Sequence, residues 1–304
     1  MDREIAVNEL AASLLAIASP LAAFDMPLLD AHGATLAEDI FAGERLVLRS
    51  GLRIRSTQIG LAASIGLNRL PTRPHPRVVV ISAGDDLVEP GQRLRDHEDE
   101  YETNSWMLTT AVKEAGAIGY RVHTIPENSE QLRLIIEDQL VRADLIVISG
   151  ESHDESFDLI TSTLQELGEI ETVIPRLVDA GRHNFGTIGP DKTPVITLPG
   201  DPIAAYISAE IFVRPMIRTM LGATNIHRSI VQAKLTHDVK SPVGFTSLIR
   251  ASLHSESQLM VTALDEQELL STLSDAQGLI ALPADSEGAL AGDIVDVMVL
   301  ERNQ

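Results

Sequence analysis

The sequence contains no cysteine, which excludes disulfides, thiolate metal sites and a cysteine nucleophile, and which fits a reducing cytoplasm. Aromatic residues make up only 3% of the 304 residues, whereas hydrophobic residues make up 44%, so the core must be aliphatic and stacking surfaces for nucleobases are scarce. No apolar run approaches the roughly 18 residues that a membrane-spanning helix needs. We therefore expect a cytoplasmic protein without membrane insertion.

Positive charge is also scarce in this sequence. Lys and Arg together number 24 against 44 Asp and Glu, which gives a formal net charge of −20 at pH 7. Binding to nucleic acid requires clustered cations that neutralise phosphates, and an excess of carboxylates repels both phosphate backbones and anionic lipid. The composition therefore argues against nucleic acid as a partner.

Residues 1–74 are expected to form a helical linker domain. Apolar side chains recur at helical spacing over residues 5–17, and further helices are expected around 36–40 and 56–67. The proline-rich stretch 70–76 is typical of a hinge between domains. A chain of 304 residues exceeds one typical domain of roughly 100–200 residues, so we place a domain boundary at this hinge.

Residues 75–222 alternate between short apolar runs and amphipathic segments, which predicts an α/β domain with a doubly wound, mostly parallel sheet. Residues 223–304 show short alternating segments, which predict a small C-terminal β-barrel or sandwich. The expected strands of the central domain are 78–81, 120–125, 145–148 and 195–198, and its expected helices are 105–115, 129–141, 157–167 and 203–221.

Three expected turns between strands and helices carry the polar residues that suggest a site. They cover residues 82–87, 149–158 and 198–202, and each contains glycine together with aspartate. In a parallel sheet these turns lie at the carboxyl ends of the strands, where backbone N–H groups at helix N-termini bind anions. Each turn alone is better explained by turn geometry and helix capping, and only the three together predict a ligand site.

The order and spacing of these turns, with Glu102-Thr-Asn-Ser-Trp106 opening the next helix, resemble the central domain of the MoeA/gephyrin family, which includes the molybdopterin molybdenumtransferases. Segments 242–250 and 276–283 resemble the C-terminal β domain of that family. The resemblance implies a MoaB/Mog-like central domain, a homodimer, and insertion of molybdate into adenylylated molybdopterin during molybdenum cofactor biosynthesis.

The resemblance also implies site residues. Asp86 and Asp158 would be the catalytic, Mg²⁺-binding carboxylates, since Mg²⁺ prefers carboxylates and water. The ordinary alternative, that both aspartates cap helices or face solvent, is favoured in the absence of a phosphate ligand. The substrate-binding residues would be Gly84, Asn104, Ser149, Gly150, Arg182, Pro199, Gly200, Asp201 and Pro202.

The sequence departs from the family pattern in two ways. The inserted β domain that family members carry is missing near residues 43–46. A Lys-Pro-Gly-Lys run of the family aligns with Asp179-Ala-Gly-Arg182, and further acids stand at positions that the family fills with other residues. Two unit charges about 4 Å apart interact by about 4 kcal/mol at an effective dielectric near 20, so these acids should disfavour a phosphate. The acids concerned are Glu151, Asp154, Glu155, Asp179 and Asp201.

These departures leave three interpretations open. The favoured one is a catalytically degenerate member that acts as a binding or scaffold protein, with a protein partner at the junction of the central and C-terminal domains. The alternative is an active molybdenumtransferase in which Arg182 grips phosphate and Mg²⁺ is the cofactor. A third is that the acidic loop 151–155 binds a cation, although a solvated loop explains it equally well. We expect His153 to be an exposed loop residue and Trp106 to be a packing residue.

Overall fold

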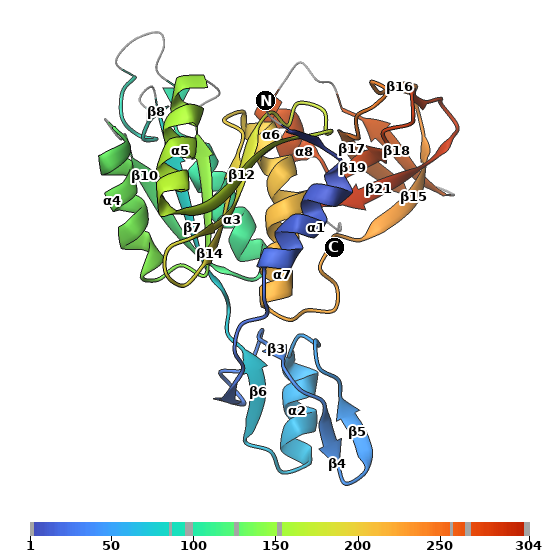
Figure 1. Ribbon diagram of the computed structural model, residues 1–304. Coiled ribbons are helices and arrows are strands. Elements are labelled where there is room, and N and C mark those ends of the chain that lie inside the picture. Colours follow the sequence, from blue (N-terminus) through green and yellow to red (C-terminus); the bar gives the residue numbers. More distant parts are fainter. Residues whose placement is uncertain are drawn as a thin grey trace.

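The computed structural model describes residues 3–84, 87–94, 100–124, 128–150, 154–255, 258–264 and 269–300. Figure 1 shows a central α/β domain, a small lobe hanging below it, and a C-terminal β-barrel at its side. No helix in these ranges combines the length and the apolar character needed to cross a membrane.

A seven-stranded sheet forms the centre of the molecule, in the order β1-β12-β13-β14-β11-β7-β10. Strands β14, β11, β7 and β10 run parallel. The residues of β14, β11 and β7 are almost all buried because helices cover both faces, whereas β10 lies at the edge of the sheet and is only partly buried. This confirms the predicted α/β class and mostly parallel sheet. The strands are β1 (Arg3–Ile5), β7 (Arg77–Ala83), β10 (Ile118–Thr124), β11 (Leu145–Gly150), β12 (Gly168–Pro175), β13 (His183–Ile188) and β14 (Thr193–Leu198).

Two helical layers sandwich this sheet (Figure 1). On one face, α4 and α5 bury Leu132, Ile136, Ile160 and Leu164 against it. On the other face lie α1, α3 and one long helix made of α6, the π-helical turn η1 and α7. The bounds are α1 (Val7–Ile17), α3 (Asn104–Ala115), α4 (Ser129–Leu140), α5 (Asp154–Leu167), α6 (Pro202–Ser208), η1 (Ala209–Val213) and α7 (Arg214–Met220).

The lobe is a small α/β unit with its own core, which includes Leu36, Ile54 and Leu70. Residues 36–40, predicted to be helical, instead belong to strands β3 and β4 or to the turn between them, so that prediction was wrong. Pairing with β5 and β6 overrides the helix propensity of this stretch. The elements are β2 (Phe24–Pro27), β3 (Thr35–Leu36), β4 (Ile40–Ala42), β5 (Arg45–Leu48), α2 (Ser56–Ser64) and β6 (Arg69–Arg73).

The C-terminal part closes into a five-stranded barrel in the order β15-β18-β17-β19-β21, as the alternating pattern predicts. A short backbone ladder ties it to the central domain, because Val178 N donates to Thr246 O at 3.0 Å and Thr246 N donates to Arg176 O at 2.9 Å. The remaining elements are β8 (Leu87–Val88), β9 (Glu100–Tyr101), β15 (Ile230–Leu235), β16 (Val239–Lys240), β17 (Ser247–Ser255), β18 (Leu259–Ala263), α8 (Leu269–Asp275), β19 (Gly278–Leu282), β20 (Gly288–Ala289) and β21 (Ile294–Val299).

Candidate functional site

The predicted turns meet at one edge of the central sheet. Strand pairing places Ser149 of β11 opposite Ser82 of β7 on one side and opposite Leu198 of β14 on the other. The carboxyl ends of these three parallel strands are therefore neighbours, as a doubly wound sheet requires. Gly84 follows β7 and is buried.

Asn104 at the start of α3 ties two of these strand ends together. Its Nδ2 donates to Ser149 Oγ at 2.9 Å and to the carbonyl oxygen of Gly200 at 2.7 Å. Ser149 Oγ in turn donates to the carbonyl oxygen of Pro199 at 3.2 Å. Asn104 is only 8% exposed, and its Oδ1 has no hydrogen-bond partner among the described residues. The side-chain amide of Asn104 therefore holds the turn at Ser149 and the turn at Gly200 at a fixed separation.

A cavity of about 310 Å³ opens beside these turns. Gly150 is a point of close approach, because a Cβ atom there would meet Ile160 Cδ1 at 2.7 Å. Of the predicted site residues, five line this cavity: Gly150, Arg182, Pro199, Gly200 and Asp201. Gly84, Asn104, Ser149, Asp158 and Pro202 are absent from its described lining.

Arg182 is the cation of this cavity, and its charge is already engaged. Its Nη1 lies 3.5 Å from Asp158 Oδ1, and its guanidinium carbon lies 4.1 Å from the ring centre of Phe157. Asp158 is 72% exposed at its side chain whereas Arg182 is 26% exposed, so the ion pair is partly screened by solvent. An incoming anion would have to compete with Asp158 for this guanidinium.

Two carboxylates line the same cavity as Arg182. Asp201 caps α6, since its Oδ1 accepts hydrogen bonds from Ile203 N at 3.1 Å and Ala204 N at 2.8 Å. Asp179 is exposed and holds a left-handed backbone with φ of 60°, a conformation that aspartate tolerates better than most residues. The described lining thus carries two carboxylates and one cation, a poor balance for holding a phosphate.

The described donors do not fit a resident Mg²⁺. Asp158 lies on α5, where it pairs with Arg182, and Asp86 lies outside the described residues. No group of three or more His, Asp or Glu side chains gathers anywhere in the described ranges in a way that would hold a metal. Glu151 and His153 lie outside the described residues, as do the side chains of Asp154 and Glu155.

Phe157, Ile160 and Thr197 line the cavity although the sequence did not single them out. Phe157 and Ile160 lie three residues apart on α5, and this spacing directs both side chains to one face of the helix. The apolar spacing of that helix was visible in the sequence, but its position against the strand ends was not.

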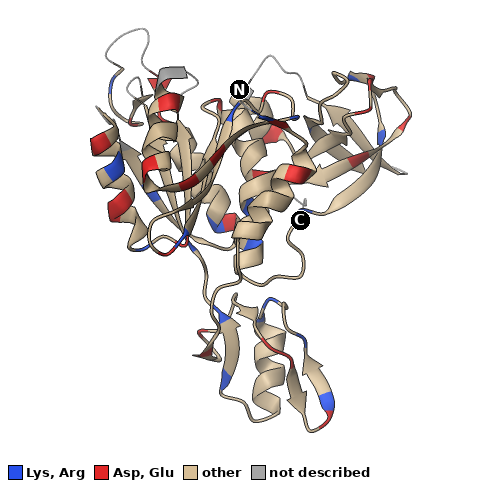
Figure 2. Ribbon diagram, in the orientation of Figure 1, with Lys and Arg blue, Asp and Glu red and all other residues tan. Residues whose placement is uncertain are grey.

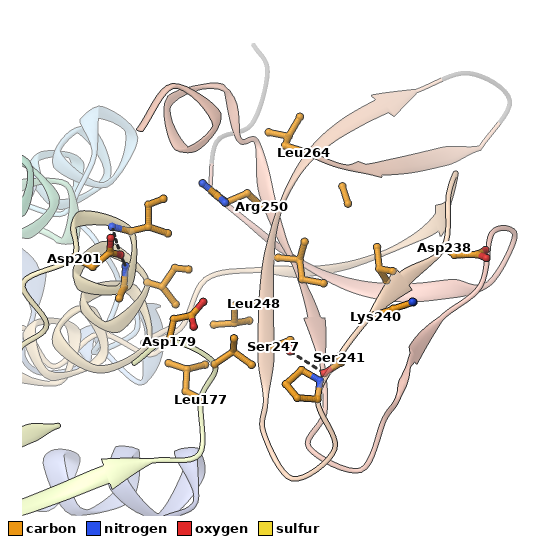
Figure 3. A pocket seen from close by; sticks show the side chains of 18 residues that line it. Leu177, Asp179, Asp201, Asp238, Lys240, Ser241, Ser247, Leu248, Arg250 and Leu264 are labelled. Atoms are coloured by element: carbon orange, nitrogen blue, oxygen red, sulfur yellow. Dashed lines mark hydrogen bonds between the residues drawn. The ribbon is translucent and has the colours of Figure 1, made fainter. Parts of the chain in front are cut away.

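A larger cavity of about 830 Å³ lies between the central domain and the barrel, and Asp179 and Asp201 line it as well. Figure 3 shows these two carboxylates on the side of the central domain, with Arg250 and Lys240 on the side of the barrel. Its apolar lining includes Leu177, Ile203, Ile207, Leu248 and Leu264. The small cavity and this junction cavity therefore share an acidic wall.

Known protein families match both the central α/β domain and the C-terminal barrel. The family described as "Probable molybdopterin binding domain" matches residues 79–219, and "MoeA C-terminal region (domain IV)" matches residues 232–300. The chain belongs to the MoeA family. This confirms the resemblance that the three turns suggested.

Curated relatives from Mycobacterium tuberculosis (strain H37Rv) are similar over most of this MoeA-family chain. Molybdopterin molybdenumtransferase 1 is 33% identical over 216 residues, which is 71% of this chain and 50% of the relative. Molybdopterin molybdenumtransferase 2 is 33% identical over 237 residues, which is 76% of this chain and 58% of the relative. The chain thus spans little more than half the length of these relatives.

Solved structures agree with the fold. A molybdopterin biosynthesis MoeA protein from Pyrococcus horikosii superposes with a TM-score of 0.85 at 19% identity, covering 99% of this chain and 100% of that chain. A molybdenum cofactor biosynthesis protein from Pyrococcus furiosus gives 0.75 at 21% identity, covering 98% and 100%.

A tight hairpin occupies the position where the family resemblance implies an inserted domain. Strands β4 and β5 pair Ala42 with Arg45, so that Gly43 and Glu44 alone form the loop. Gly43 has φ of 61°, the positive φ that the first loop position of such a hairpin requires. This MoeA-family chain is therefore a shortened member at an internal position.

Proposed function

We propose that this protein is a MoeA-like member of the molybdopterin pathway that does not transfer molybdenum and acts as a binding or scaffold protein. The observation that carries the proposal is the charge arrangement of the small cavity. Arg182 is engaged by Asp158 and Phe157, and the lining also contains the carboxylates of Asp179 and Asp201. A dianionic phosphate placed there would meet two carboxylates and no uncommitted cation among the described lining residues.

Loss of the inserted domain supports the same proposal. The hairpin loop of Gly43 and Glu44 leaves no chain at this position from which a further domain would reach a substrate. In the family the inserted domain is understood to complete the catalytic cleft, so both the charge and the enclosure of the site differ from those of an active member.

The junction cavity supports a binding role. Its volume of about 830 Å³ lies in the range of ligand sites, and its apolar lining suits a peptide with aliphatic or aromatic side chains. The acidic wall favours a basic residue in that peptide, because opposite charges across an interface fix register and exclude wrong partners. We expect the protein to be a homodimer in this role, which light scattering after size-exclusion chromatography would establish.

A second candidate function is molybdopterin binding with transfer. The names of the relatives at 33% identity favour it, as does the intact link from Asn104 to Ser149 and Gly200. The retained turn geometry would still present backbone N–H groups at the strand ends.

Calorimetry separates the two candidates. The purified full chain should give no detectable heat with molybdopterin or with adenylylated molybdopterin, whereas a relative such as molybdopterin molybdenumtransferase 1 should bind under the same conditions. Micromolar affinity of this chain for either compound would overturn the proposal and leave the transferase as the better candidate.

A further inference from the structure

A separate cavity of about 500 Å³ is lined by residues of α3, α6 and α8 and by Leu300, which follows strand β21. Helix α6 separates it from the junction cavity, because Tyr206 lines this cavity while Ile203 and Ile207 line the other. Concave, mostly apolar sites of roughly 300–1,000 Å³ with a few polar groups are the usual form of small-molecule sites. The apolar lining is Met107, Ala111, Leu270, Leu273, Ala276 and Leu300.

Trp106 lines this cavity and is held in a fixed orientation. The guanidinium carbon of Arg121 lies 4.1 Å from its ring centre, and its Nε1 donates to Glu89 Oε2 at 3.3 Å. The residue is nevertheless 51% exposed, so it is not the packing residue that the sequence suggested. An indole fixed by two partners and left half exposed at an apolar cavity provides a preformed surface for aromatic stacking or for a cation.

The charges around the cavity favour a cationic ligand. The guanidinium of Arg228 is held by three hydrogen bonds, since Nε and Nη2 donate to Glu210 at 2.7 Å each and Nη1 donates to the carbonyl oxygen of Leu300 at 2.6 Å. Glu114, 58% exposed at its side chain, lies 3.9 Å from Arg228 Nη2, too far for a hydrogen bond. This contact is a long, exposed ion pair and not a hydrogen bond, so the carboxylate of Glu114 can still accept a hydrogen bond from an incoming donor.

The spacing of these groups sets the size of the ligand. Trp106, Thr110 and Glu114 lie at intervals of four residues on α3 and all line the cavity, so they share one face of the helix. At a rise of about 1.5 Å per residue, the backbones of Trp106 and Glu114 lie about 12 Å apart along the helix. Both side chains are long, so the distance between the indole ring and the carboxylate is shorter than the distance between the backbones.

We propose that this cavity binds a small aromatic amine, with the ring against Trp106 and the ammonium group beside Glu114. The proposal is independent of the function proposed above, because none of the described lining residues is shared with the junction cavity or the small cavity.

Trp106 is the only tryptophan of the chain and reports on its own site. Titration of the full chain with 2-phenylethylammonium should change its fluorescence saturably, whereas 3-phenylpropionate, which has a similar shape and the opposite charge, should give no saturable change. No saturation with the amine would overturn the site, and equal responses to the two compounds would overturn its charge selectivity.

Variants localise the binding. Glu114→Gln should weaken amine binding by about fivefold, the upper range for one exposed ion pair. Glu166→Gln, a change of the same kind at an exposed position of α5, should leave the affinity unchanged. Trp106→Leu should abolish the heat of binding in calorimetry while the melting temperature stays close to that of the parent. Retained binding in Trp106→Leu would place the ligand elsewhere and contradict the proposal.

Discussion

Arg228 and Glu210 form a bidentate ion pair that joins the barrel to the central domain. Glu210 lies on the π-helical turn η1, and Arg228 precedes the first barrel strand β15. Both distances are 2.7 Å, and the side chains are only 2% and 15% exposed. The hydrogen bonds from Arg228 to Glu210 raise the pKa of this guanidinium, which therefore keeps its positive charge in the pair.

Removal of one partner should therefore be costly. We expect Glu210→Gln to lower the free energy of unfolding by about 3 kcal/mol, because it leaves a buried guanidinium without its counter-ion. Glu137→Gln, which breaks the exposed pair with Arg133, is the matched control and should cost less than about 0.5 kcal/mol. Urea unfolding followed by circular dichroism measures both. Equal losses in the two variants would show that the buried pair does not hold the domains together.

His183 should make stability depend on pH. Complete burial lowers the pKa of His183 to about 4 from 6.5, and its Nε2 lies 3.2 Å from Ser208 Oγ. His183 takes up a proton near pH 6.5 in the unfolded chain but only near pH 4 in the folded chain. The stability that the neutral, buried ring contributes is therefore complete above pH 6.5 and is lost as the pH falls from 6.5 to 4. The loss should reach about 3 kcal/mol at 1.36 kcal/mol per pKa unit.

Unfolding measured at pH 7 and at pH 5 tests this dependence. The difference in stability between the two pH values should shrink in His183→Gln and stay the same in His254→Gln, where the ring is exposed. An unchanged difference in His183→Gln would show that other groups set the pH dependence.

We expect Asp201 to stabilise the fold through the hydrogen bonds that its Oδ1 accepts, and not through its negative charge. Its Oδ1 caps α6 by accepting from Ile203 N and Ala204 N, and asparagine offers the same oxygen. Asp201→Asn should leave the melting temperature nearly unchanged, whereas Asp201→Ala should cost about 1 kcal/mol. If the asparagine variant loses as much as the alanine variant, capping is not the role of this residue.

Neutralising the acidic wall should restore affinity for an anion. We expect Asp179→Asn combined with Asp201→Asn to raise the affinity for pyrophosphate by about tenfold, a factor that corresponds to 1.4 kcal/mol and allows for screening by salt. Asparagine tolerates the left-handed backbone at position 179 and the cap at position 201, so the fold should persist. Calorimetry at low salt measures the change. Asp238→Asn, on the barrel side of the junction cavity, is the control and should leave pyrophosphate affinity unchanged.

The centre of the sheet was predictable because β7 and β11 contain continuous apolar runs rich in β-branched residues. Residues 78–81 and 145–148 are fully buried in β7 and β11 as expected. Strands β12 and β13 were missed, although Gly168–Pro175 carries alternating polar and apolar residues. Strand β13 pairs antiparallel with both β12 and β14, an arrangement that a pattern of alternating strands and helices does not reveal.

The turns that form the candidate site could be predicted from the sequence, but the side-chain contacts within the site could not. The turns at Ser149 and Gly200 follow from glycine placement after buried strands, and the structure brings them together. The pairing of Arg182 with Asp158 joins the segment after β12 to the N-terminal half of α5, and no local pattern encodes that distance. Asp86 stays a prediction, because it lies outside the described residues.

The π-helical turn η1 gives the long helix a position where its length can change. A π turn holds one residue more than the α-helical turn it replaces, and that residue bulges while both flanking segments keep their faces. Deletion of Ile211 should therefore convert η1 to plain α-helix with little effect on packing. A one-residue deletion within α7 would instead rotate the following residues by about 100°. A one-residue deletion should thus be tolerated within η1 and should destabilise the protein within α7.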